Sequence, residues 1–219
     1  MNTPGALRLG ILISGRGSNM AAIARQCQEG RIRAEVAVVL SERPEAAGLA
    51  TAREFGIATR AIAWPGAAQR AQFEQAAAAA LEDAGAELVV LAGFMRILSP
   101  AFVAARAGAI LNIHPSLLPK YPGLHTHQRV LAAGEHQHGA TVHFVTSELD
   151  GGPRVLQSRL VVHPGESEAT LSARVQATEH IIYPRVIGWR ADRRLVWRAD
   201  GPWLDGRPLT QPLIEDFNA

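Results

Sequence analysis

The sequence has a single cysteine and no long apolar run, and each shortage excludes a class of protein. Cys27 alone among 219 residues cannot form an internal disulfide. It lies in an expected helix and is interpreted as a small core residue rather than a nucleophile, so a reducing compartment is expected. No apolar stretch reaches the length that crosses a bilayer, and the N-terminus does not read as a secretion signal. We therefore expect a cytoplasmic protein with no membrane contact.

The chain also has little net charge. The 22 Lys and Arg residues nearly balance 20 Asp and Glu residues, which leaves a net charge of +2. No basic run is present, so a nucleic acid partner is not expected. The hydrophobic content of 47% over 219 residues is enough to bury one substantial core, and we expect one domain with small appendages.

Apolar runs and helical segments alternate along the first half of the chain. The expected strands are 7–14, 36–41, 57–63, 88–92 and 109–113, and the expected helices are 20–28, 46–55 and 69–84. A further helix begins at Ser99-Pro100. Strands that are apolar on both faces and separated by helices are typical of an α/β fold with a mostly parallel sheet covered on both sides. A ligand site is then expected at the carboxyl ends of the strands.

The second half changes character after Gly139. Strands at 141–145 and 155–162 have no helix between them, so an antiparallel pair at the sheet edge is expected. A long helix follows from 167 to 183, which Pro184 bends or interrupts. The tail, with segments 195–198 and 203–206, is predicted to form a hairpin.

Asn112 and His114 follow an apolar run and stand two residues apart. Side chains at this spacing leave the same face of a strand, so the amide and the imidazole point into one cleft. The prolines and Gly123 that follow form a loop over it. Both groups can stabilise an oxyanion and the imidazole can move a proton, so acyl or formyl transfer is the predicted chemistry.

Asp150 lies in a glycine-rich loop after the strand at 141–145. An ordinary turn aspartate is the commoner explanation for such a residue. If this strand lies beside the one that ends at Ile113, however, Asp150 returns over the same cleft as His114. A carboxylate there would orient the imidazole and favour its protonated form.

The segment 15–19 joins the first strand to a helix start, where free N–H groups and the helix dipole favour an anion. A phosphate monoester is the favoured ligand. A dinucleotide is the alternative, because Glu42 stands where a ribose-binding acid would, but Met20 replaces the third glycine of that fingerprint. A plain tight turn is the third interpretation.

Two other groups of polar residues are weaker candidates. Five histidines lie between 125 and 143, but no cysteine ligand, HExxH helix or carboxylate partner accompanies them. Exposed loop histidines are the simpler interpretation, and no metal is expected. Gln176 and Glu179 share a helix face, which sequence physics alone turns toward water.

Four segments, 13–19, 91–98, 112–119 and 139–153, occur in an order that resembles the folate-dependent formyltransferase family, and within it the phosphoribosylglycinamide formyltransferases. The resemblance covers nearly the whole chain. Arg154, where an apolar residue is expected, and the segment from Ala191 onward are its departures.

This resemblance implies a Rossmann-like fold and direct formyl transfer from 10-formyltetrahydrofolate, used as a co-substrate, to the amine of glycinamide ribonucleotide in de novo purine synthesis. It implies a single domain over 1–219, with a phosphate-binding half to about 107, a folate and catalytic half from about 108 to 190 and a hairpin tail. A monomer or a homodimer is expected. The implied site residues are Asn112, His114 and Asp150 for catalysis, Gly17, Ser18 and Asn19 for the substrate phosphate, Gln176 and Glu179 for the substrate, and Arg70, Met95, Arg96, Ile97 and Leu98 for the folate.

Two alternatives to this function are open. One is another enzyme that uses 10-formyltetrahydrofolate. The tRNA-directed members carry a C-terminal domain, for which no room is expected after Tyr183, and the deformylase carries an N-terminal regulatory domain, whereas the first strand here begins at Leu7. The other is a non-catalytic nucleotide-binding module, in which Asn112 and His114 are a packed, hydrogen-bonded pair.

Overall fold

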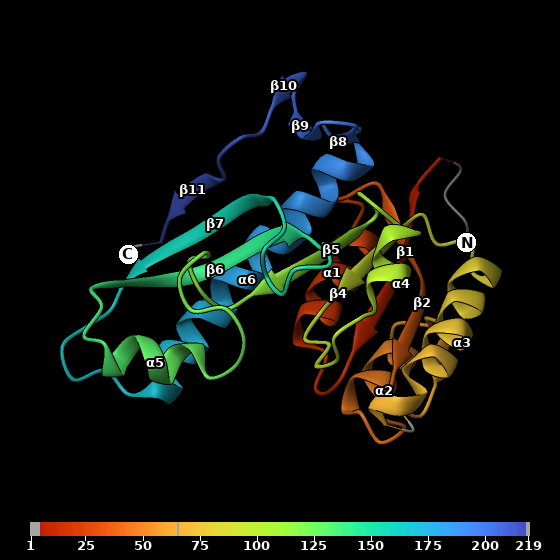
Figure 1. Cartoon of the computed structure of the whole chain (residues 1–219), viewed down its shortest axis with the longest axis horizontal. Coiled ribbons are helices and arrows are strands. Elements are labelled where there is room, and N and C mark those ends of the chain that lie inside the picture. The colour runs from red at the N-terminus through yellow and green to blue at the C-terminus, as the bar shows by residue number, and fades with distance from the viewer. Residues whose placement is uncertain (1–4, 65, 218–219) are drawn as a thin grey trace.

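The computed structural model describes residues 5–64 and 66–217, which form one large sheet with helices on both faces and a small second sheet (Figure 1). The helices are α1 (Ser18–Gln28), α2 (Ala47–Glu54), the 3-10 turn η1 (Ala67–Gln69), α3 (Arg70–Asp83), α4 (Pro100–Ala104), α5 (Thr126–Ala132) and α6 (Glu168–Ala191). The strands are β1 (Leu7–Ile13), β2 (Ala34–Ser41), β3 (Thr59–Ala61), β4 (Leu88–Leu91), β5 (Ile110–His114), β6 (Gln137–Phe144), β7 (Arg154–Val161), β8 (Leu195–Arg198), β9 (Gly201–Leu204), β10 (Arg207–Pro208) and β11 (Leu213–Asp216).

The large sheet has the order β11-β7-β6-β5-β4-β1-β2-β3. Neighbours from β3 to β5 pair in parallel, and β6 is antiparallel to both β5 and β7. The mostly parallel α/β sheet and the antiparallel pair near its C-terminal edge confirm the predicted fold class. One strand was not predicted: β11 pairs in parallel with β7 and lies outside it.

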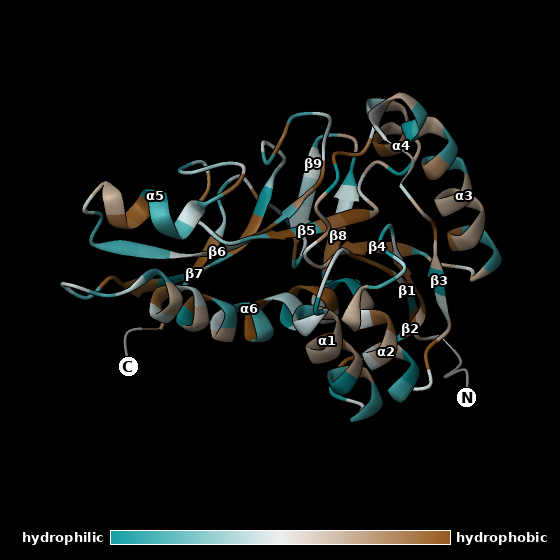
Figure 2. Ribbon diagram, turned by 90° about the horizontal axis from the view of Figure 1, so that it is seen from below, coloured by the Kyte–Doolittle hydropathy of each residue, from teal (hydrophilic) through white to brown (hydrophobic). Residues whose placement is uncertain are grey.

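Two apolar layers hold the helices on the sheet (Figure 2). Helices α1, α2 and α6 lie on one face, while α3 and α4 cover the other face with residues such as Phe73 and Phe102. Strand β4 has all four residues buried, because a parallel strand covered by helices on both sides is apolar throughout. Gly10 of β1 has no side chain because a Cβ there would lie 2.1 Å from Cδ2 of Leu81.

The predicted helix starts are present. Ser99 caps α4 by accepting a hydrogen bond from the N–H of Phe102, and Ser167 caps α6 in the same way through Thr170. Helix α6 differs from the expectation at its other end, because it continues through Pro184 to Ala191. Pro184 is buried in the core together with Tyr183 and Val186, and this packing outweighs the backbone hydrogen bond that the proline lacks.

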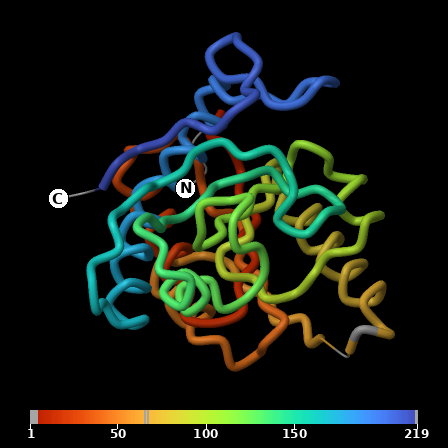
Figure 3. The backbone as a smooth tube through the Cα atoms, turned by 60° about the vertical axis from the view of Figure 1, so that its left-hand side comes forward, coloured from red at the N-terminus to blue at the C-terminus, as the bar shows by residue number. Residues whose placement is uncertain are grey.

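The tail forms the predicted hairpin, in which β8 and β9 pair antiparallel and β10 adds a third short strand. Figure 3 shows this hairpin projecting from the rest of the chain. It is anchored by Trp197, whose ring lies 4.9 Å from that of Phe144 at the end of β6. Gly108 receives the same tryptophan, since a Cβ at Gly108 would lie 2.1 Å from its ring.

The order of the strands decides where a site can form. The segments after β1, β4 and β5 leave the carboxyl ends of neighbouring parallel strands, which is where ligands bind in open α/β sheets. Tyr183 of α6 links two of these strands, β4 and β5, because its hydroxyl lies 3.1 Å from the carbonyl of Leu91 and 3.0 Å from that of Leu111. Among the described residues, no helix combines the length and apolar character that crossing a bilayer requires.

Candidate active site

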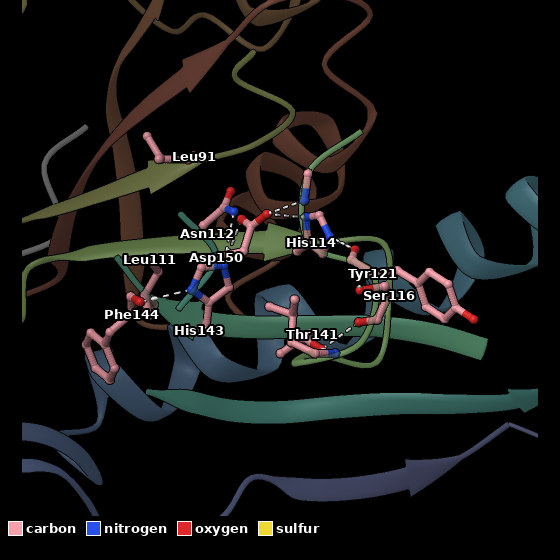
Figure 4. A network of polar contacts seen from close by, with 12 residues as sticks. Leu91, Leu111, Asn112, His114, Ser116, Tyr121, Thr141, His143, Phe144 and Asp150 are labelled. Carbon is pink, nitrogen blue, oxygen red and sulfur yellow. Dashed lines mark hydrogen bonds and ion pairs between the residues drawn. The ribbon is translucent and has the colours of Figure 1, made fainter. Parts of the chain in front are cut away.

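Asn112 and His114 lie on β5, and both side chains face the same polar cluster (Figure 4). His114 is buried, with 6% of its surface exposed, and Asn112 is half-buried. Their common direction confirms the spacing argument made from the sequence, because alternate residues of a strand share a face.

Asp150 joins these two residues, although it lies in the loop between β6 and β7. Its Oδ2 atom is 3.4 Å from Nδ1 of His114, and it also accepts a hydrogen bond of 2.8 Å from the N–H of Gly123. The sequence argument for Asp150 required that the strand before it lie beside β5, and β6 does pair with β5. Asp150 adopts a left-handed backbone conformation with φ of 52°, which turns its carboxylate back over the cleft.

The imidazole of His114 is held by a backbone carbonyl. Its Nε2 atom lies 2.9 Å from the carbonyl oxygen of Tyr121, in the proline-rich loop after β5. A carbonyl can only accept, so Nε2 carries a hydrogen and Nδ1 is the nitrogen that faces Asp150. The loop after β5 therefore orients the ring, and the Asp150 carboxylate stands at the other nitrogen as a compensating charge.

His143 is a fourth member of the cluster, and the sequence reasoning missed it. Its Nε2 atom lies 3.1 Å from Nδ2 of Asn112 and 3.8 Å from Oδ1 of Asp150. Its Nδ1 donates to the carbonyl of Phe144, so Nε2 is left to accept from the amide. Burial lowers the pKa of this imidazole to about 4, which keeps it neutral and able to accept. The register of β5 and β6, which places His143 directly opposite Asn112, is the signal that would have found it.

The segment between β1 and α1 has the geometry of an anion site. Gly17 precedes α1 in a left-handed conformation with φ of 71°, no side chain caps the helix, and its first turn has no acidic residue. Within the described part of the chain, the N–H groups at Ser18 and Asn19 therefore lie at the positive end of the helix dipole without a capping side chain, an arrangement that suits an anion. Gly48 of α2 packs against this turn and donates a hydrogen bond of 3.0 Å to the carbonyl of Gly15.

Asn19 and Glu179 connect this turn to α6. Nδ2 of Asn19 lies 2.8 Å from Oε2 of Glu179, although 160 residues separate them. Glu179 is 7% exposed, so the expectation of a solvated face from sequence physics alone is wrong for it, while Gln176 is half-buried. Burial raises the pKa of Glu179 to about 7, with the Asn19 hydrogen bond acting in the opposite direction. Oδ1 of Asn19 is buried without a partner in the described part of the chain.

The proposed folate residues follow β4 or begin α3. Met95 and Ile97 are 61% and 62% exposed, which is unusual for large apolar side chains, while Leu98 is buried and Arg96 and Arg70 are half-buried. The N–H of Met95 donates to Oγ of Ser14 at the end of β1, which ties this loop to the turn at 15–19.

The remaining histidines do not form a metal site within residues 5–64 and 66–217, where no three His, Cys, Asp or Glu side chains could hold an ion. The interpretation of exposed loop histidines is wrong for three of them, since His127 is half-buried on α5. His138 and His143 are buried on β6, and His138 bonds to His127 of α5. Cys27 packs against the core, and burial raises the pKa of its thiol to about 12, as expected for a structural residue.

Comparisons with known proteins identify the family of the chain. A model of the formyl transferase family matches residues 7–187. The chain is 50% identical to the phosphoribosylglycinamide formyltransferase of Escherichia coli over 91% of this chain and 94% of that protein. It is 41% identical to the enzyme of the same name from Haemophilus influenzae, over 92% and 95% of the two chains. The solved structure of a phosphoribosylglycinamide formyltransferase from Coxiella burnetii superposes with a TM-score of 0.88 at 43% identity, covering 95% and 99%.

Proposed function

This chain belongs to the formyl transferase family, and from that premise we propose that it transfers the formyl group of 10-formyltetrahydrofolate to the amine of glycinamide ribonucleotide in the cleft at Asn112, His114 and Asp150. It is a formyltransferase of purine biosynthesis, as its 50% identity over most of the chain indicates. The observation that carries the proposal is the convergence of these three side chains, from β5 and from the loop after β6, at the same edge of the sheet as the N-terminus of α1.

Direct transfer needs a group that stabilises the oxyanion. The neutral substrate amine attacks the formyl carbon, the new C–N bond forms, and the carbonyl electrons move to oxygen. One hydrogen of the Asn112 amide is held by His143, so the other is available to this oxyanion. Protonated His114 donates a second hydrogen bond to the oxyanion from Nδ1, and the nearby Asp150 carboxylate compensates the imidazolium charge.

Collapse of the intermediate completes the reaction. The bond between the formyl carbon and the folate nitrogen breaks, the amine loses a proton, and the folate nitrogen gains one. His114 is suited to moving this proton, directly or through water, because its other nitrogen is fixed on the Tyr121 carbonyl.

The two substrates fit different parts of the cleft in this proposal. Gly17, Ser18 and Asn19 receive the phosphate of the ribonucleotide, and Gln176 and Glu179 contact the same substrate. The folate takes the surface of Arg70 and Met95 to Leu98, where the exposed apolar side chains suit a flat, largely apolar ring.

We further propose that residues 1–219 act as a single domain in the cytoplasm. The phosphate-binding half to about 107 and the folate and catalytic half to about 190 meet at the strand ends. Arg70 and Met95 to Leu98, which are proposed to contact the folate, lie in the first half and not in the half named for the folate, so both halves contribute to one cleft; the hairpin follows as a tail.

One assay separates this function from its alternatives. The purified protein is incubated with 10-formyltetrahydrofolate, with and without glycinamide ribonucleotide, and release of tetrahydrofolate is followed. Release that requires the amine supports the proposal. Release without the amine would identify a deformylase, and no release in either case would leave a nucleotide-binding module.

A further inference from the structure

Glu42 is a buried carboxylate that the proposed reaction does not use. It follows β2 at the carboxyl end of the sheet and is 3% exposed. Neither of its oxygens has a hydrogen-bond partner in the described part of the chain. A buried charge without compensation is costly, so a group of opposite charge is expected nearby.

That group is Arg96 of the loop after β4. Its Nε atom lies 3.5 Å from Oε1 of Glu42, while Nε of Arg43 lies at 3.8 Å. The guanidinium carbon of Arg96 also stands 5.2 Å from the ring centroid of Trp64, a cation–π distance. Arg96 is therefore held on one side by a carboxylate and on another by an aromatic face.

The exposed part of Arg96 is its terminal fork. Nε is buried, whereas the side chain as a whole is 35% exposed. Within residues 5–64 and 66–217, no hydrogen bond is made by either terminal nitrogen of Arg96. Two parallel N–H groups in this fixed geometry match a carboxylate.

The surrounding loop is already fixed by other contacts. The ring of Phe94 stacks on Phe73 at 6.0 Å, and Phe73 meets Trp64 edge-on at 5.3 Å. Met95 bonds to Ser14 through its backbone. Glu42 is thus not needed to hold the loop backbone, and its remaining role concerns the direction of the Arg96 side chain.

We propose that Glu42 is a positioning residue that holds the Arg96 guanidinium with its terminal nitrogens toward the cleft, as a preformed clamp for a carboxylate of the folate. This inference rests on the proposed function. Of the two substrates, the folate alone carries carboxylates, whereas the ribonucleotide carries a phosphate that the turn at 15–19 already receives.

The test measures binding of tetrahydrofolate and of the primary amide of tetrahydropteroate, which carries no carboxylate, by titration calorimetry. Glu42→Gln should weaken the affinity for tetrahydrofolate about five- to tenfold and leave the affinity for the tetrahydropteroate amide within about twofold of the wild type. In steady-state assays the KM for 10-formyltetrahydrofolate should rise while kcat and the KM for the ribonucleotide stay unchanged. Glu45→Gln, an exposed carboxylate in the same segment, is the matched control and should change nothing.

A double-mutant cycle with Arg96→Ala gives the decisive readout. If Glu42 acts through Arg96, Glu42→Gln should add no further loss of tetrahydrofolate affinity in the Arg96→Ala background. An undiminished loss there, an equal loss for the tetrahydropteroate amide, or tighter binding of tetrahydrofolate by Glu42→Gln would overturn the inference. A wild-type protein that binds no tetrahydrofolate would instead overturn the proposed function, so the two failures are distinguishable.

Discussion

Nδ2 of Asn112 lies 3.1 Å from Nε2 of His143, and this contact decides which end of the amide can meet the substrate. Because Nδ1 of neutral His143 donates its hydrogen to the Phe144 carbonyl, Nε2 carries no hydrogen and can only accept. The Asn112 amide is therefore fixed with one N–H on His143 and the other toward the cleft. The proposed oxyanion donor is oriented by a residue from the neighbouring strand.

Replacing His143 with alanine should lower kcat on the order of ten- to a hundredfold, because an amide free to rotate no longer presents its donor. The KM values should change much less. Steady-state kinetics at saturating concentrations of both substrates measure this, with His136→Ala, an exposed histidine just before β6, as the control. An unchanged kcat in a folded His143→Ala protein would remove the orienting role.

Asn112→Ala should lower kcat on the order of a hundred- to a thousandfold, as expected for the loss of an oxyanion donor. Asp150→Asn should lower it at least about tenfold, since the imidazolium loses its compensating charge. Both proteins should retain the far-UV circular dichroism of the wild type. Asp192→Asn, an exposed aspartate after α6, is the matched control, and near-normal turnover by Asp150→Asn would exclude Asp150 from the mechanism.

His143 and His138 should both be neutral at about pH 6, because burial lowers the pKa of each to about 4. In the unfolded chain these imidazoles have the ordinary pKa of 6.5. Between pH 6.5 and about 4 the unfolded state therefore binds more protons than the folded state, so the free energy of unfolding should fall as the pH drops through this range. Nitrogen-15 NMR of the imidazoles tests the protonation state directly. His143 should show the Nδ1–H form, and imidazolium signals from either residue at that pH would contradict the prediction.

Glu179 should make stability depend on pH in the opposite direction. Its folded pKa of about 7 lies above the ordinary value of 4.5, so the folded state holds the proton more tightly and loses stability as the pH rises through this window. Relative to Glu179→Gln, the wild type should lose on the order of 3 kcal/mol between about pH 5 and 8. Urea unfolding at both pH values measures this difference. Glu54→Gln, an exposed carboxylate on α2, should instead run parallel to the wild type.

Gly48→Ala should weaken the binding of the ribonucleotide more than the binding of the folate. A Cβ there would lie 2.5 Å from Cδ1 of Ile13, 3.0 Å from the carbonyl oxygen of Gly15 and 3.1 Å from Cα of Gly17, so both the Ile13 side chain and the proposed phosphate turn must shift. We expect the KM for glycinamide ribonucleotide to rise about tenfold or more, since misplaced donors lose most of their value. Ala50→Ser, exposed on the same helix, serves as the comparison, and equal changes for both substrates would argue against a phosphate site here.

The parts of this site that depend on local periodicity could be predicted. Asn112 and His114 share a face because strand side chains alternate, and the first strand, the turn at 15–19 and α1 follow from apolar patterning and glycine placement. The prediction for Asp150 needed one further condition, the adjacency of β5 and β6, and that condition holds.

The parts that depend on register or on backbone groups could not be predicted. His143 is found only when Asn112 is known to face it across an antiparallel pair. The partner of His114 is the carbonyl of Tyr121, and a carbonyl has no signature in the side-chain sequence. Glu179 looked solvated because its partner, Asn19, lies at the opposite end of the chain. Strand β11, with a mixed and mostly exposed sequence, carried no strand signal of its own.

The backbone conformation of Asp150 also suits residues that lack the carboxylate of the proposed mechanism. Its φ of 52° is a conformation that glycine adopts without strain and that asparagine tolerates well, so the backbone accepts either substitution, and any cost to stability comes from the lost contacts with Gly123 and His114. Both substitutions delete the carboxylate. Thermostability screens that ignore turnover would therefore not register the loss of the carboxylate as a loss of function, and engineering of this enzyme for heat resistance should hold Asp150 constant.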